Sequence, residues 1–374
     1  MTYNARIFWR TPTASQHCSI CTAYSVLSTL TFTDNFVSSH KGSAFMKRLL
    51  TLTILLTVSV ASAADKPTMP AIDKPVMFDT PEADKIMAAL QIYPPDNPWN
   101  EDISKLPVRK NSKEMIAGIG ADKRIAYNLD MGYIIVPPSQ KKVDVKIKSY
   151  PDESDKGPYP IPDNAPIENW PLDKRSLEET QKKKENGDRH VIVVDPVNRM
   201  LYEFYQGRKL DDGSWECACE ATFDLKSNKL RPAGWTSSDA AGLPILPSII
   251  RYDEVERGMV EHAMRFTVRK TKREYVYPAT HFASRLTDPN LPRMGERFRL
   301  RADFDVSGFS PHMQAILKGL KKYGMYQADN GGDWRISVAP DKRIKGLDEL
   351  RKLKGSDFEV IEPTGPNEGP RAKK

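Results

Sequence analysis

Residues 234–255, with the sequence GWTSSDAAGLPILPSIIRYDEV, constrain the fold of this chain more than any other segment. They are too apolar for an ordinary surface loop, and Pro244 and Pro247 are incompatible with a helix interior or a central strand. Burial of each large apolar side chain would contribute about 1.5–3 kcal/mol. We therefore predict an ordered strap that packs over a sheet and is a candidate for one wall of a cleft.

The three segments before this strap predict the sheet that it covers. RHVIVVD (189–195), MLYEFYQG (200–207) and SWECACEATFDL (214–225) are apolar or alternating runs separated by short polar turns. Strands joined by such turns form an antiparallel meander. Cys217 and Cys219 point to one face of the third strand, either as two buried free thiols or as one strained disulfide.

The other segments predict short helices and further strands. The TPE run at 80–82 and the SP pair at 310–311 are typical helix starts, and the second of these helices ends at Gly324. Helices are also expected at 111–120 and 346–355, strands at 133–136, 141–148, 274–284, 296–306 and 357–363, a hairpin at 325–338, and either element at 259–268. The predicted fold class is α+β and sheet-dominated, with mostly antiparallel strands, a few short helices and long proline-rich straps.

A three-part pattern typical of a secretory signal peptide begins at Met46. Lys47 and Arg48 supply the positive region, residues 49–60 the apolar run, and Ala61-Ser62-Ala63 the cleavage site. The run is too short for a spanning helix, which needs about 20 residues. We interpret residues 1–45 as a mis-assigned N-terminal extension, 46–63 as the signal peptide, 64–79 as a flexible linker, 80–362 as a single secreted domain and 363–374 as a disordered tail. The mature protein is expected to be secreted or periplasmic, with no membrane association after cleavage.

The charge of the predicted mature chain argues against nucleic acid as a partner. Residues 1–63 hold five Lys or Arg and one Asp, so their removal lowers the net charge from +7 to +3. In the remaining chain, basic residues alternate with acidic ones, which is typical of a solvated face. Cys18 and Cys21 fall in the extension, and their CxxC spacing without a second pair is a weak metal signal.

Several long strings resemble a family of secreted bacterial proteins that has no assigned activity. They include GWTSSDAAGLPILP, IIRYDEV and YGMYQADNGGDW, and the resemblance covers roughly residues 95–362. It implies extracytoplasmic placement and one continuous module. It implies no catalytic residues, so the chemistry is inferred from the side chains themselves.

Four side chains are candidates for catalysis: Asp239, His281, Asp303 and Asp329. Cleavage of a polysaccharide requires a pair of acids, or an acid and a base with a charge-neutralising group. Each candidate also has a structural alternative, because Arg and Asp alternating on a strand form an ion-pair ladder and the Asp of DNGG supports a turn. The candidate substrate-binding residues are Trp235, Tyr252, Arg285 and Trp334.

Two functions of different classes remain. No HExxH, GxSxG, GxGxxG or P-loop motif is present, so we predict no metal and no cofactor. The first function is a polysaccharide-cleaving hydrolase or lyase, and the alternative is a non-catalytic module that binds extracellular carbohydrate or cell-envelope material. In both cases we expect a monomer. The enzyme is favoured if Asp239, His281 and either Asp303 or Asp329 converge within one cleft, whereas scattered, ion-paired positions favour the binding module.

Overall fold

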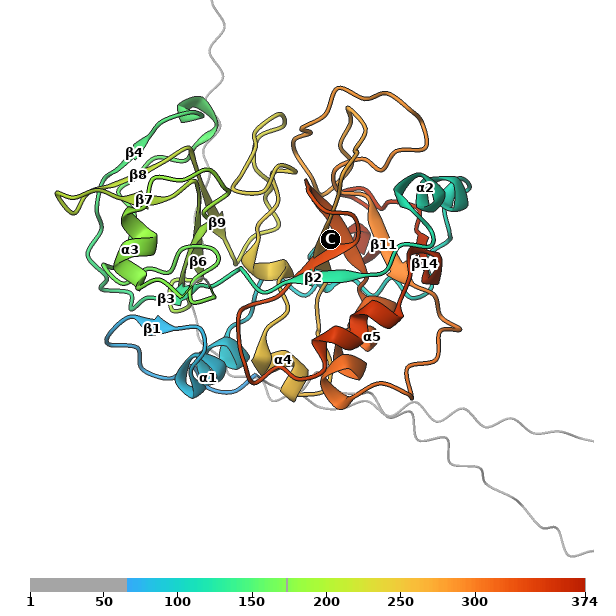
Figure 1. The fold of residues 1–374 in the computed structure, drawn as a ribbon, viewed down its shortest axis with the longest axis horizontal. Helices are drawn as coiled ribbons and strands as arrows, with labels where there is room; N and C mark the ends of the chain where they lie inside the picture. The colour runs from blue at the N-terminus through green and yellow to red at the C-terminus, as the bar shows by residue number, and fades with distance from the viewer. Residues whose placement is uncertain (1–65, 173, 374) are drawn as a thin grey trace, which may run out of the picture. The chain divides into compact units, whose positions relative to one another are not determined.

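The meander predicted over 189–225 forms, and it makes up three adjacent strands at one side of the first sheet (Figure 1). β5 (Val191–Asp195), β6 (Met200–Tyr205) and β9 (Cys219–Asp224) pair antiparallel in that order. β3 (Ile134–Ile135) lies parallel to β5, and β1 (Val76–Met77) pairs antiparallel with β3 at the edge. All of β5 is buried because hydrophobic clusters cover both faces of the sheet, which explains its continuous apolar run.

The structure, a computed structural model, describes residues 66–172 and 174–373. The predicted N-terminal extension with Cys18 and Cys21, and the predicted signal peptide, lie outside the described residues. The described residues belong to one compact unit, 62–374. Helix and strand are about equally frequent, and the strands form three mixed sheets.

The second sheet is built mainly from the C-terminal part of the chain. Its order is β14 (Phe358–Val360), β11 (Arg297–Leu300), β12 (Met325–Asn330), β10 (Met264–Val268), β13 (Arg335–Ser337) and β2 (Ala126–Asn128). The prediction of a hairpin at 325–338 is wrong, because β10 lies between β12 and β13 and pairs with both. α5 (Pro311–Lys322) begins at the predicted SP pair and packs its apolar stripe into the core of this sheet.

A small third sheet holds β4 (Val145–Ile147), β8 (Trp215–Cys217) and β7 (Arg208–Lys209). The third strand of the predicted meander is therefore divided at Ala218 between two sheets. Its thiols are buried and free, which decides between the alternatives for Cys217 and Cys219. Each sheet contains a parallel pair, so the prediction of mostly antiparallel sheets is wrong. Parallel pairing joins segments that are distant in the chain, and local patterns do not reveal it.

Short helices connect and cover the sheets. α1 (Pro81–Ala89) begins as predicted, since the Thr80 hydroxyl accepts the Ala83 N–H at 3.2 Å and Pro81 takes the first helical position. The other helices are α2 (Ser112–Ile119), α3 (Leu177–Lys182) and α4 (Tyr252–Glu256), with 3-10 turns η1 (Pro98–Asn100), η2 (Pro151–Glu153), η3 (Leu246–Ser248), η4 (Leu347–Lys352), η5 (Gly355–Asp357) and η6 (Gly369–Lys373).

Three predicted segments differ from the structure. The described part of the expected linker places Val76 and Phe78 in the hydrophobic core. The segment 274–284 forms an isolated bridge between Tyr275 and Met294 instead of a strand. In the expected tail, Arg371 is buried and lies 3.6 Å from the Glu101 carboxylate. In each case contacts with residues distant in the chain decide the conformation.

The apolar strap is ordered and buried, as predicted, and it joins the first two sheets. Glu203 of β6 is fully buried, and its carboxylate accepts the N–H groups of Ile245 at 2.8 and 2.9 Å and of Leu246 at 2.8 Å. Further along, Ile250 bridges to Val338, next to β13. Burial raises the pKa of Glu203 to about 7. The first sheet therefore holds the strap through one buried carboxyl group.

We expect Glu203→Ala to lower the free energy of unfolding by about 2–4 kcal/mol, because two buried N–H groups lose their acceptor and a cavity opens. Chemical denaturation at neutral pH measures the loss. Glu203→Gln is the matched control, since its amide oxygen remains an acceptor, and it should lose less than half as much. Equal losses in the two variants would contradict this role.

Candidate active site

A buried ion pair fixes the polar part of the strap against the second sheet. Asp239, on the strap, is 0% exposed, and Arg265, on β10, is 3% exposed. The guanidinium donates from Nη2 to Asp239 Oδ1 at 2.6 Å and from Nε to Oδ2 at 2.8 Å. Its Nη1 donates to the Ser337 hydroxyl at 2.5 Å. Both Asp239 oxygens are thus engaged, so this carboxylate acts by position and charge and is not free to take a proton from substrate.

Two other predicted residues, Asp329 and His281, contact the backbone of Ala240, next to Asp239. The Ala240 N–H donates to Asp329 Oδ2 at 3.4 Å, and the Ala240 carbonyl lies 2.7 Å from His281 Nδ1. Because a carbonyl only accepts, Nδ1 carries the proton in this contact, and Nε2 of a neutral ring keeps its lone pair. Asp329, at the end of β12, and His281 are both partly exposed. Three of the four predicted catalytic residues therefore converge.

The environment of Asp329 keeps it protonated. Burial of the carboxyl, followed by the negative charge of Asp239, raises the pKa of Asp329 to about 8, although Arg265 opposes the shift. Asp188 adds to the same effect. At neutral pH Asp329 is therefore a partly exposed carboxylic acid with a proton to donate.

A second charge pair supports the strap from the first sheet. His190 lies 3.1 Å from Glu168 through Nδ1 and 2.9 Å from the Ser238 carbonyl through Nε2. Both partners are acceptors, so the ring donates twice and is a cation. Burial opposes this charge, but Glu168 raises the pKa of His190 to about 10. His190 is a positioning residue, since neither ring nitrogen is free to accept a proton.

Sequence reasoning missed several residues of this cluster. Arg265 was not proposed as the partner of Asp239, because the two are joined only through the tertiary fold. Asp188, in the polar run NGDRH, has the composition of a turn, and it is exposed. Asp130 has a buried Oδ1 without a hydrogen-bond partner among the described residues, and burial and Glu168 raise its pKa to about 6. An acid at the edge of a predicted strand is the one signal that pointed to Asp188.

Asp303 does not join this cluster. Its carboxylate is exposed and pairs with Arg301 two residues earlier, with oxygen–nitrogen distances of 2.8 and 3.1 Å. It lines a separate pocket of about 760 Å³ beside α2, with Arg109 and Phe358. Asp303 is ion-paired, but within a turn after β11 and not in the predicted ladder along a strand, and among the described residues it has no hydrogen bond or ion pair with those around Ala240.

The four predicted substrate-binding residues lie in different places. Trp334 is 0% exposed and stacks on Phe266 in the core, so its ring faces are covered. Tyr252, in α4, lies under the guanidinium of Arg343 at 3.9 Å. Trp235 lies under Arg231 at 5.5 Å. Arg285 alone lies beside the cluster, in the pocket described next.

An open pocket of about 520 Å³ adjoins His281. It is lined by Arg273, Phe282 and Arg285, with Ala283 and Ser284. The Phe282 ring stacks on His281 with 5.9 Å between centroids and an interplanar angle of 7°. Neither Arg273 nor Arg285 forms an ion pair with a carboxylate in the described residues. The pocket therefore holds two guanidinium groups without an ion-pair partner, and Phe282 connects it to the candidate base.

In residues 66–172 and 174–373, no group of three or more His, Cys, Asp or Glu is arranged to hold a metal ion. Within the same ranges no helix combines the length and apolarity needed to cross a membrane.

Comparison with protein-family models, curated proteins and solved structures finds no match to this chain.

Proposed function

We propose that this protein is a polysaccharide hydrolase that works outside the cytoplasm, with Asp329 as general acid and His281 as general base. The observation that supports it most is the meeting of Asp239, Asp329 and His281 at Ala240. Glycoside hydrolysis needs a proton donor and a proton acceptor that retain different protonation states at one pH. The charge of Asp239 keeps the proton on Asp329, while the Ala240 carbonyl holds the tautomer of His281.

In the proposed reaction, Asp329 gives its proton to the glycosidic oxygen as the bond to the anomeric carbon breaks. His281 Nε2 takes a proton from a water molecule, and the resulting hydroxide adds to the anomeric carbon. Nearby Asp188 is exposed, and its negative charge favours an oxocarbenium-like transition state. Proton exchange with solvent then restores both side chains.

The pocket beside His281 favours an acidic polysaccharide. The guanidinium groups of Arg273 and Arg285 suit carboxylate or sulfate substituents, while the Phe282 ring stacks with His281 and Tyr275 and lies under Arg273. The same features favour the second candidate function, a module that binds acidic glycans without cleaving them.

Export and family membership are part of this proposal. They are supported by the leader pattern at 46–63 and by the resemblance to secreted bacterial proteins. We propose a sheet-rich, single-domain α+β mature protein that starts at Ala64, acts as a monomer and meets its substrate in the periplasm or outside the cell.

The test is to incubate the mature protein with neutral and acidic polysaccharides and cell-wall fractions and to measure new reducing ends. We expect Asp329→Asn to lower the rate by a factor of roughly 10²–10⁴, the usual contribution of a general acid. Asp303→Asn is the matched control, because this acid is exposed and away from Ala240, and it should leave the rate unchanged.

Two outcomes would contradict the hydrolase, and a third would contradict the role of Asp329. Unsaturated, ultraviolet-absorbing products would identify a lyase instead. Retention on a fraction without product would favour the binding module. Equal rates for Asp329→Asn and Asp303→Asn would remove Asp329 from the mechanism even if hydrolysis occurs.

A further inference from the structure

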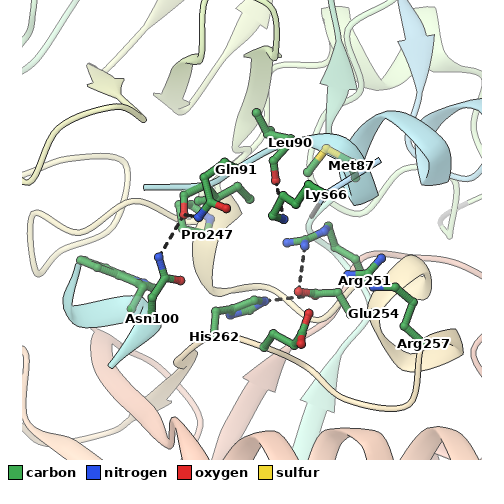
Figure 2. Close-up of a pocket in the computed structure, with 13 residues that line it drawn as sticks. Lys66, Met87, Leu90, Gln91, Asn100, Pro247, Arg251, Glu254, Arg257 and His262 are labelled. Carbon is green, nitrogen blue, oxygen red and sulfur yellow. Dashed lines mark hydrogen bonds and ion pairs between the residues drawn. The ribbon is translucent and has the colours of Figure 1, made fainter. Parts of the chain in front are cut away.

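A third pocket lies at the other end of the strap, around Arg251 (Figure 2). Its volume is about 120 Å³. Leu90 and Trp99 provide apolar walls, and Pro247 and Arg251 line it from the strap. Because a cavity of roughly 150 Å³ accepts benzene, this one has the size for a small organic molecule.

Arg251 is the main polar group of this cavity. It is 3% exposed; its Nε lies 3.2 Å from Asp253 Oδ1 and its Nη2 lies 2.8 Å from Glu254 Oε1. Its Nη1 is buried without a hydrogen-bond partner among the described residues. A buried guanidinium N–H without an acceptor is costly, so this atom points to an acceptor supplied by a ligand.

Two further cations share the cavity with Arg251. Lys66 donates one hydrogen bond, to the Leu90 carbonyl at 2.8 Å, and lies next to Arg251 in Figure 2. Burial, and then the charges of Arg251 and Arg257, lower the pKa of Lys66. Lys66 thus lies in a positive electrostatic environment, and an ammonium group has two more protons to donate.

The neighbouring carboxylates leave this positive charge available. Glu254 is engaged by Arg251 and by His262 Nε2 at 3.1 Å, and Asp253 by Arg251 and Arg257. Glu261 also lines the cavity and is exposed, as Lys66 is, so solvent screens the charges of both. A singly charged ligand fits this balance better than a dianion, which Glu254 would repel.

We propose that this cavity binds a small organic carboxylate, with its oxygens on Arg251 Nη1 and Lys66 Nζ and its apolar body against Trp99 and Leu90. Such a site combines an apolar pocket with a few convergent polar groups, which is typical of small-molecule sites. It does not depend on polysaccharide hydrolysis, because no residue around Ala240 lines it.

The test is calorimetric titration of the mature protein with benzoate, benzyl alcohol and inorganic phosphate. Benzoate should bind, benzyl alcohol should bind at least tenfold more weakly because it lacks the charge, and phosphate should show no binding at the same concentration. Lys66→Met should weaken benzoate binding at least tenfold. Lys74→Met, at an exposed lysine, should not change it.

The proposal is overturned if benzoate does not bind the wild-type protein. It is also overturned if benzyl alcohol or phosphate binds as tightly as benzoate, or if Lys66→Met and Lys74→Met bind benzoate equally. A thermal unfolding curve for each variant confirms that it is folded, and Lys66→Met should fold, since Lys66 makes one backbone hydrogen bond.

Discussion

Asp239→Asn lowers the free energy of unfolding by about 3–5 kcal/mol, the usual loss when one partner of a buried ion pair is removed. The reason is the burial of Arg265, which is 3% exposed and donates to both oxygens of Asp239. Without the carboxylate charge, the guanidinium stays in a site closed to water. Chemical denaturation of the mature protein at pH 7 gives the value.

Two controls separate the ion pair from general damage. The double variant Asp239→Leu with Arg265→Met removes both charges and should recover a large part of the loss, because an apolar pair can replace a buried ion pair. Asp303→Asn breaks the exposed pair with Arg301 and should leave stability unchanged. A small effect of Asp239→Asn, below about 1 kcal/mol, would show that the pair is not closed to water.

Asp329→Asn becomes increasingly stabilising, relative to the wild-type protein, as the pH rises. The pKa of Asp329 is about 8 in the folded protein, against about 3.9 in an unfolded chain. Between these values the folded state binds more protons, so the free energy of unfolding of the wild-type protein falls as pH rises. Asparagine resembles the protonated acid and removes this dependence.

Unfolding curves at pH 5, 6, 7, 8 and 9 measure the difference between the two proteins. At pH 9 we expect Asp329→Asn to be more stable than the wild-type protein by about 2 kcal/mol. This is less than the free-energy difference that the two pKa values alone would give, because Asp329 is partly exposed. His190, whose pKa is raised to about 10, continues to lower the stability of both proteins above pH 6.5. Parallel curves for the two proteins would contradict the raised pKa of Asp329.

Local sequence patterns predicted the elements that are determined by residues close together in the chain. The sequence predicted the cap at Thr80, the start of α5 at the SP pair, and the apolar or alternating runs of β5, β6 and β9. The sheet order was not, because pairing of β10 with β12 and β13 depends on segments about 60 residues apart. Likewise, the strap was predicted from its composition, but its attachment to Glu203 is a contact between distant parts of the chain.

In the candidate site, too, some residues were predicted from local sequence and others depend on the tertiary fold. Asp239, His281 and Asp329 were chosen because each follows or lies within a turn or a proline break, where side chains are free to converge. Asp303 was chosen on a predicted strand face beside Arg299 and Arg301, but β11 ends at Leu300 and Asp303 lies in the turn that follows it. Trp334 was predicted to bind substrate, but Phe266 and the core behind β13 cover its ring.

The most direct test of the whole account is the protonation of Asp329 itself. Carbon-13 NMR is recorded on mature protein that is labelled at the aspartate side chains and titrated from pH 4 to 10. The carboxyl resonance that is absent from the spectrum of Asp329→Asn belongs to Asp329. The account predicts a midpoint near 8. A midpoint near 4, the ordinary aspartate value, would leave no proton on Asp329 at neutral pH and would contradict the proposed general acid.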